Sequence, residues 1–202
     1  AAEPYHTSTA QTLLFIKKFS AMKADIVSVI FGEKFYSDDQ LLNHFKFINN
    51  KSPIPLLLHQ QILENGLSSN PPFVYYPLQV LKKISTLSKF IAMKEDAKND
   101  LYTKKISLSM SNHITIITSG SGKRQWIKAN KYGAQSWLSG ISNLDPLIGI
   151  DFWNYFKDGN LEQLNLIINK LEDPFFRVKK KYGWHLTIKS CLEHFKLMKR
   201  YE

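Results

Sequence analysis

Cysteine is almost absent from this sequence, since Cys191 is the only one among 202 residues. A single cysteine excludes an intramolecular disulfide and is typical of a protein from a reducing compartment. The first ten residues contain no basic segment followed by an apolar run, which argues against a signal peptide. No apolar stretch approaches the roughly 20 residues that a transmembrane helix requires. These absences predict a cytoplasmic protein without a membrane partner.

Several signatures of cofactor and metal sites are missing too. No predicted strand is followed by G-x-G-x-x-G, and no G-x-S-x-G nucleophile elbow occurs. The six histidines show no metal-ligand spacing, so we predict no metal site. The turn "SGSGKRQW" at 119–126 departs from a phosphate loop, because Ile117 replaces its first glycine and Arg124 replaces its Ser or Thr. A turn between a strand and a helix is the simpler interpretation.

The charge balance raises the question of nucleic acid as a partner. The sequence has 27 basic and 17 acidic residues, a net charge of +10. However, the basic residues are spread widely, with their main clusters at 179–181 and 196–200, and no arginine-rich stripe is present. This distribution favours a solvated lysine-rich surface over a nucleic-acid interface. Apolar residues make up 44% of the chain, enough for one sizeable core.

Short apolar runs alternate with longer helical patterns along the chain. The runs predict five strands, at 25–31, 54–59, 90–94, 113–120 and 135–142, with one helix between each strand and the next. Further helices are expected at 146–157, 160–172 and 183–199. Strict alternation with fully apolar strands indicates a parallel sheet covered by helices. Two architectures fit this α/β pattern, a doubly wound sheet and a (β/α) barrel.

The stretch "FIAMKEDAKND" at 90–100 places a lysine, Lys94, where an apolar strand turns polar. In a strand Lys94 shares a face with Ala92, whereas Ile91 and Met93 point the other way. If the bulky side chains pack on helices, Lys94 faces a barrel interior, where lost hydration makes its amine nucleophilic. A solvated strand end is the other interpretation. His59 also ends an apolar strand, on the face of Leu57.

Several segments resemble the dihydrodipicolinate synthase / N-acetylneuraminate lyase family of class I aldolases. "FIAMKEDA" resembles its sixth-strand motif, "ITSG" at 117–120 its seventh-strand turn, and "YGAQSWLSGISNLDP" at 132–146 its eighth-strand segment. "KADIVSVIFGEKFYSDDQLLNHFKFI" is similar to its fourth strand and the helix that follows. The similarity covers nearly the whole chain. Each motif is degenerate, and their order and spacing carry the resemblance.

This resemblance implies a lyase of the aldolase, synthase or dehydratase type. Lys94 would form a Schiff base with pyruvate or a related 2-oxo acid, and His59 would transfer protons. Ser119, Gly120 and Leu138 would lie in the substrate pocket together with Glu64. No cofactor is implied, because the protonated imine is itself the electron sink. Family members are commonly oligomers, so a homodimer or homotetramer is expected.

Two substitutions depart from the family pattern. His59 stands where the family usually has a proton-relaying tyrosine. Histidine exchanges protons near neutral pH, but it differs from tyrosine in reach. Glu64 stands where synthases with an acidic second substrate have an arginine. Because a carboxylate repels such a substrate, Glu64 argues against dihydrodipicolinate synthesis.

The resemblance also implies a (β/α)8 TIM barrel of which this chain supplies about the last five strands. Residues 1–145 would form strands four to eight of the barrel, and 146–202 a C-terminal helical extension. Five parallel strands cannot close a barrel. We therefore expect the chain to be the C-terminal portion of a longer protein. Two alternative functions remain, a non-catalytic relative that binds a small ligand and a basic nucleic-acid-binding protein.

Overall fold

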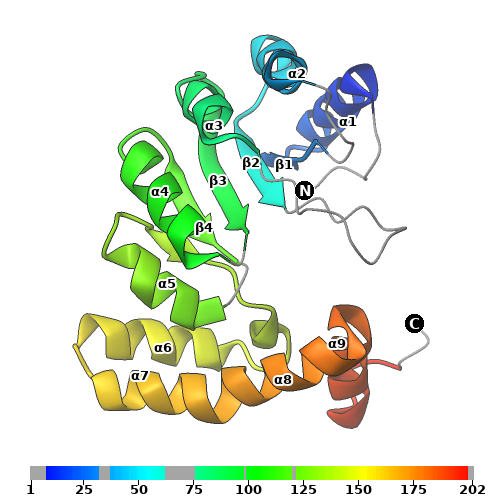
Figure 1. Cartoon of the computed structure of the whole chain (residues 1–202). Coiled ribbons are helices and arrows are strands. Elements are labelled where there is room, and N and C mark those ends of the chain that lie inside the picture. Colours follow the sequence, from blue (N-terminus) through cyan, green and yellow to red (C-terminus); the bar gives the residue numbers. More distant parts are fainter. Residues whose placement is uncertain (1–7, 32–36, 62–75, 98, 120–121, 200–202) are drawn as a thin grey trace. The chain divides into compact units, whose positions relative to one another are not determined.

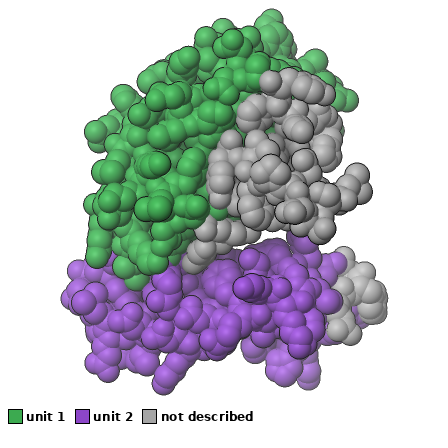
Figure 2. All heavy atoms as spheres, in the orientation of Figure 1, with its two compact units in different colours: residues 1–121, 125–137 green, residues 122–124, 138–202 purple. Residues whose placement is uncertain are grey.

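The computed structural model describes residues 8–31, 37–61, 76–97, 99–119 and 122–199 (Figure 1). The chain divides into two compact units, coloured separately in Figure 2. The first unit contains residues 1–121 and 125–137, and the second contains residues 122–124 and 138–202. The glutamate predicted for the substrate pocket, Glu64, and the predicted pocket glycine, Gly120, lie outside the described residues.

A five-stranded parallel sheet forms the centre of the first unit. Its strands are β1 (Val27–Val29), β2 (Leu56–Gln61), β3 (Phe90–Asp96), β4 (Thr115–Thr118) and β5 (Ser136–Trp137). They lie side by side in the order of the sequence, and every neighbouring pair is parallel. In a doubly wound sheet the order in which strands are added reverses at a switch point, so that neighbouring strands there are not consecutive in the sequence. The steady advance of these strands is that of a (β/α) barrel, so the predicted partial barrel is confirmed and the doubly wound alternative is wrong.

Within the described ranges, one helix lies between each strand and the next, as predicted. Helix α1 (Thr9–Ala21) precedes β1, and the connecting helices are α2 (Asp38–Lys51), α3 (Leu78–Ser85), α4 (Asp100–Met110) and α5 (Gly122–Asn130). Figure 1 shows α2 to α5 following one side of the sheet. Ser8 begins α1 with a capping box, because Ser8 and Gln11 each accept a hydrogen bond from the other's backbone N–H.

The core of the first unit lies between the sheet and its helices. The strands contribute fully buried aliphatic side chains, which meet equally buried residues of the helices. The strand members are Val27, Val29, Leu56, Leu58, Met93 and Ile116, and the helical members include Leu41, Phe45, Ile48, Leu81, Ile84, Ile106 and Met110. Full burial of each such side chain contributes roughly 1.5–3 kcal/mol. This packing assigns alternate residues of β1 and β2 to the helix side, together with Met93 of β3 and Ile116 of β4.

The second unit is helical beyond a short 3₁₀ helix, η1 (Gly140–Asn143). Its helices are α6 (Leu147–Lys157), α7 (Leu161–Ile167), the π-helical segment η2 (Ile168–Glu172), α8 (Asp173–Tyr182) and α9 (Trp184–His194). The predicted helices correspond to α6, to α7 with η2, and to α9. The sequence prediction contained no helix at 173–182, where the structure has α8; Pro174 stands in its first turn, a position that proline fits. Gly183, with φ of 87°, ends α8.

Candidate active site

The strand register brings His59 and Lys94 together in the first unit. His59 of β2 is paired with Lys94 of β3, and Lys94 is paired with Ile117 of β4. Paired residues of neighbouring parallel strands lie on the same face of a sheet. The two residues that the sequence singled out independently are therefore neighbours on one face.

A register shift in β3 decides which face that is. Leu56 pairs with Phe90 and Leu57 with Ala92, so Ile91 is an extra residue, a β-bulge. Phe90 faces the helices, where its ring packs edge-on against Phe45 of α2 at 5.7 Å. After the bulge the alternation is inverted. Consequently Ala92 and Lys94 point away from the helices.

The strand is longer than the sequence predicted, which changes the position of Lys94. β3 continues through Glu95 to Asp96, so Lys94 lies within the strand and not at its end. The side chain of Lys94 is half-buried, and Ala92, two residues earlier, is buried. Met93 is fully buried, as predicted, but Ile91 is 48% exposed, since the bulge separates it from the helix side. The interpretation of Lys94 as a solvated strand end does not fit this position.

Asp96 is an acidic neighbour that the sequence analysis missed. Its Oδ2 lies 3.8 Å from Nε2 of His59, and the two side chains are 19% and 17% exposed. Asp96 pairs with Gln61 and follows Lys94 by two residues, which places it on the same face as Lys94. The position of Asp96 two residues after Lys94 in the sequence is the signal that predicts a shared face. With Asp96 included, this face carries an amine, an imidazole and a carboxylate.

Ser119 extends the same group at the end of β4. Its backbone N–H donates to the carbonyl oxygen of Glu95 at 2.9 Å, which continues the ladder past Thr118. Ser119 is two residues from Ile117, the register partner of Lys94. Within the described part of the chain, neither Oγ of Ser119 nor Nε2 of His59 has a hydrogen-bond partner, although both atoms are buried. Two buried polar atoms are thus available for a ligand near Lys94.

Leu138, predicted for the substrate pocket, belongs to the second unit and is 48% exposed. It directly precedes Ser139, which begins η1. The structure therefore brings together Lys94, His59 and Ser119 of the predicted residues. The roles assigned to these residues and to Leu138 stay predictions.

Glu95 points to the opposite side of the sheet from Lys94 and is fully buried. Its Oε1 accepts from the N–H of Ala97 at 2.6 Å, and its Oε2 accepts from Oγ1 of Thr103 at 2.7 Å and from Nε2 of Gln125 at 3.1 Å. Burial is the main cause that raises the pKa of Glu95 to about 7, and the hydrogen bonds from Thr103 and Ala97 oppose that rise. Glu95 directly follows Lys94 in β3. The structure separates them.

The second unit contains a buried ion pair that the sequence analysis did not find. Nζ of Lys123 lies 3.0 Å from Oε1 of Glu172, and the two side chains are 0% and 2% exposed. The backbone N–H of Lys123 donates to Oε2 of the same carboxylate at 2.9 Å. Nζ of Lys123 also donates to Oγ of Ser139 at 3.0 Å. The pair fixes the start of α5 to η2 and to the residue that begins η1.

The described part of the chain contains neither a cluster of metal ligands nor a membrane-spanning helix. No three His, Cys, Asp or Glu side chains there lie close enough together to hold a metal ion. None of its helices is both long enough and apolar enough to span a bilayer.

Comparison with solved structures identifies the fold. The chain is similar to dihydrodipicolinate synthase from Oceanobacillus iheyensis, with a TM-score of 0.79 at 17% identity, over 98% of this chain and 63% of that one. It is equally similar to the dihydrodipicolinate synthase from Bacteroides thetaiotaomicron, with a TM-score of 0.79 at 14% identity, over 100% and 66%. The chloride-inhibited enzyme from Acinetobacter baumannii, solved with pyruvate, gives 0.78 at 14% identity, over 95% and 62%.

The comparisons show which fold this chain shares and how much of the longer structures it matches. The chain spans about 63% of the length of the Oceanobacillus structure, as a partial barrel should. No protein-family model matches the sequence, and no curated protein matches it. The fold implied by the resemblance in sequence is therefore confirmed: nearly all of this chain has the fold of part of a dihydrodipicolinate synthase barrel.

Proposed function

We propose that the chain is part of a Schiff-base lyase of the dihydrodipicolinate synthase / N-acetylneuraminate lyase family, acting on a small 2-oxo acid. The observation that carries this proposal is the register of β2 and β3, which pairs His59 with Lys94 on the face opposite the helices. Nε2 of His59 and Oγ of Ser119, buried and without a hydrogen-bond partner among the described residues, support a ligand at this face. The similar structure from Acinetobacter baumannii is a complex with pyruvate, which supports that class of ligand.

In the proposed reaction, the neutral amine of Lys94 adds to the C2 carbonyl carbon of the 2-oxo acid. A proton on the C2 hydroxyl lets it leave as water, which gives a protonated imine between Nζ and C2. A bond from C3 then breaks and its electron pair forms a C2–C3 double bond, while the electron pair of the carbon–nitrogen double bond moves onto nitrogen, so that an enamine results and no external oxidant is needed. A proton added at C3 restores the protonated imine, and hydrolysis by one water returns the amine and releases the keto acid.

The proton transfers in this reaction are assigned to His59. An imidazole can both accept and donate a proton, and Oδ2 of Asp96 lies 3.8 Å from its Nε2. Ser119 supplies a hydroxyl two residues beyond the register partner of Lys94. Gly120 and Leu138 enter the proposal as pocket residues through the family resemblance alone, and so does Glu64.

Trapping of the imine tests the proposal. The full-length protein is incubated with pyruvate, reduced with borohydride, digested and analysed by mass spectrometry. We expect a reduced pyruvate adduct on Lys94. Lys94→Met should lose the adduct, and Lys89→Met, which removes a lysine just before the same strand, should keep it. An adduct confined to other lysines, or no adduct, would contradict the proposal.

A second candidate function is a non-catalytic relative that binds a 2-oxo acid. The observation in its favour is His59 at the family's tyrosine position. If this candidate is correct, pyruvate forms the adduct on Lys94 but no carbon–carbon or carbon–oxygen bond is broken. Turnover that falls in His59→Phe while trapping persists would favour the lyase instead.

We also propose that the full-length protein forms a homodimer or homotetramer. One similar structure is that of a monomeric dihydrodipicolinate synthase variant, with a TM-score of 0.81 at 16% identity, so the fold alone does not fix the number of subunits. Light scattering coupled to size-exclusion chromatography measures this number directly. A cytoplasmic location stays a prediction.

A further inference from the structure

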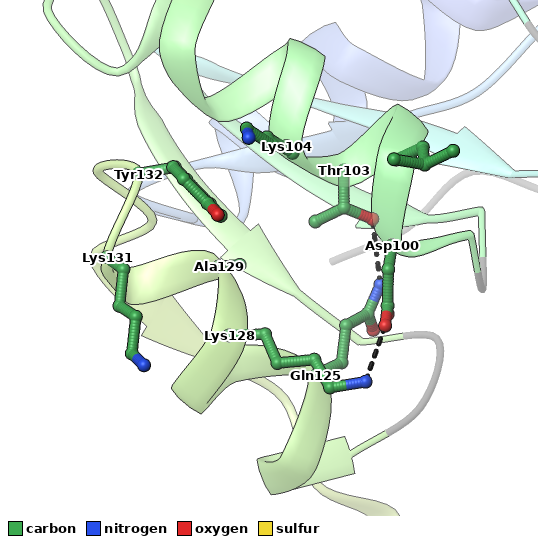
Figure 3. Close-up of a pocket in the computed structure, with 9 residues that line it drawn as sticks. Asp100, Thr103, Lys104, Gln125, Lys128, Ala129, Lys131 and Tyr132 are labelled. Carbon is green, nitrogen blue, oxygen red and sulfur yellow. Dashed lines mark hydrogen bonds and ion pairs between the residues drawn. The ribbon is translucent and has the colours of Figure 1, made fainter.

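A cavity of about 300 Å³ lies between α4 and α5, in the first unit and on the helix side of the sheet. It is separate from the face that carries Lys94 and His59, because Glu95, which lies beneath it, points away from that face. Figure 3 shows the side chains that surround this α4–α5 cavity. Its volume is at the lower end of the range for small-molecule sites.

The floor of the cavity is polar and held in place. It is formed by Thr103 and Gln125, which are 1% and 2% exposed. Nε2 of Gln125 donates to Oγ1 of Thr103 at 3.0 Å and to Glu95 at 3.1 Å, and Thr103 donates to the same carboxylate. Because these side chains are locked by hydrogen bonds, a ligand would meet a preformed surface and would not have to order it.

The rim of the cavity is cationic. Three lysines and one aspartate line it, Lys104, Lys128, Lys131 and Asp100. Both side chains of the Asp100–Lys128 ion pair are more than half exposed. An exposed pair contributes little net free energy, so Lys128 can exchange Asp100 for another anion. Glu95 below the floor adds less than a full negative charge at neutral pH, because its pKa is raised to about 7. The surroundings therefore favour an anion.

Tyr132 contributes both an aromatic surface and a hydroxyl. Nζ of Lys104 lies 4.5 Å from the centre of its ring, a cation–π contact. Figure 3 shows the Tyr132 side chain extending from its backbone into the space between the helices. Leu101 of α4 and Ala129 of α5 supply apolar wall on either side. A ligand that suits this lining has an apolar body and one charged end.

We propose that the α4–α5 cavity binds a small organic anion, with its charged group at Lys104 and Lys128 and its apolar body against Leu101, Ala129 and the ring of Tyr132. The site is independent of the proposed lyase activity. It assigns a ligand-binding role to the outer layer of helices.

Phenyl phosphate is a suitable probe, because it combines an aromatic body with a doubly charged end. Binding is measured by isothermal titration calorimetry, with inorganic phosphate as the comparison. Phenyl phosphate should bind more tightly than inorganic phosphate, since the cavity has apolar walls. Equal binding of the two probes, or no binding of phenyl phosphate at millimolar concentration, would overturn the proposal.

Matched variants locate the site. Lys104→Met should weaken binding about tenfold, as expected for loss of a charge-assisted hydrogen bond. Lys105→Met removes the same charge from the neighbouring exposed position of α4, outside the cavity lining, and should change binding less than about twofold. Equal losses in both variants would show a general charge effect and contradict the proposal.

A filling variant tests the cavity without changing its charge. Ala129→Leu adds three carbon atoms at a buried position in the wall. It should abolish phenyl phosphate binding while Lys104 and Lys128 remain. Unchanged binding in a folded Ala129→Leu protein, checked by circular dichroism, would exclude this cavity as the site. If this variant does not fold, the pair Lys104→Met and Lys105→Met decides the matter.

Discussion

Among the residues that the structure describes, each unit buries one glutamate, and the two carboxyl groups have different hydrogen-bond partners. Glu95 in the first unit is 0% exposed, and Glu172 in the second is 2% exposed. Glu95 receives hydrogen bonds from neutral donors, the Thr103 hydroxyl, the Gln125 amide and the Ala97 N–H. Glu172 receives its hydrogen bonds from the ammonium and the backbone N–H of Lys123 and from the Ser139 hydroxyl.

The difference shows that equally buried carboxyl groups can have different electrostatic surroundings. Neutral donors satisfy the oxygen atoms of Glu95 but supply no positive charge, and its pKa rises to about 7. Glu172 has a cation at 3.0 Å, whose attraction opposes the cost of burying the carboxylate. Removal of one partner should therefore destabilise the second unit most, whereas a change of pH should act mainly on the first.

The largest effect is expected for Lys123→Met. This substitution keeps an apolar chain of similar length but leaves the carboxylate of Glu172 buried without its cation. Loss of one partner of a buried pair costs about 3–5 kcal/mol, so the free energy of unfolding in urea should fall by that order. The double variant Lys123→Met/Glu172→Leu should recover much of the loss. A double variant as unstable as Lys123→Met would show that the loss comes from poorer packing at position 123 and not from the unpaired charge of Glu172.

A pH dependence of intermediate size is expected from Glu95. The pKa of Glu95 is raised from 4.5 to about 7 in the folded protein, so between these values the folded chain retains a proton that the unfolded chain has lost. Stability should consequently fall as the pH rises from about 4.5 to about 7, by about 3 kcal/mol in total, and then level off. Urea unfolding at pH 5 and pH 8 measures the difference.

Glu95→Gln should remove this pH dependence. The amide can take the place of the protonated acid, because the Thr103 hydroxyl can donate to the Asn99 carbonyl oxygen instead, 2.9 Å away. Glu162→Gln, at an exposed position of α7, is the control for loss of one carboxyl group. If Glu95→Gln loses stability between pH 5 and pH 8 as the parent does, then Glu95 is not the group that titrates.

The smallest effect is expected for Arg124→Met. Arg124 and Asp173 form an ion pair at 2.7 Å, one residue further along each of the two segments that Lys123 and Glu172 join. Their side chains are 46% and 37% exposed, and exposed pairs contribute about 0–1 kcal/mol. Urea unfolding of Arg124→Met next to Lys123→Met compares two pairs that differ mainly in burial. A loss as large as that of Lys123→Met would contradict the role assigned to burial.

The sequence was informative where a pattern repeats along the chain. Five apolar runs, each separated by one helix, predicted the parallel sheet, and the family resemblance predicted the barrel that the strand order confirms. The alternation of Ala92 with Lys94 predicted their shared face correctly. His59 was placed on the face of Leu57, and the register pairs both with residues of that face. These features follow from local periodicity.

The sequence was less informative where the partner strand or a distant helix decides. Nothing in "FIAMKED" marks Ile91 as the extra residue, because a bulge depends on how β2 pairs with β3. The separation of Glu95 from Lys94 depends on Thr103 and Gln125, which come from two later helices. The Lys123–Glu172 pair joins residues 49 positions apart, and no local pattern relates them.

The bulge at Ile91 decides which chemical groups of β3 lie on which side of the sheet. Phe90 is anchored against Phe45, so a regular strand in which Ile91 paired with Leu57 would exchange the two faces of everything after Ile91. The amine of Lys94 would then point into the layer of helices, where Thr103 and Gln125 now bind a carboxyl group, and Glu95 would point to the other face. One extra residue at the start of the strand, and not the identity of any later side chain, therefore keeps the amine on the face of His59.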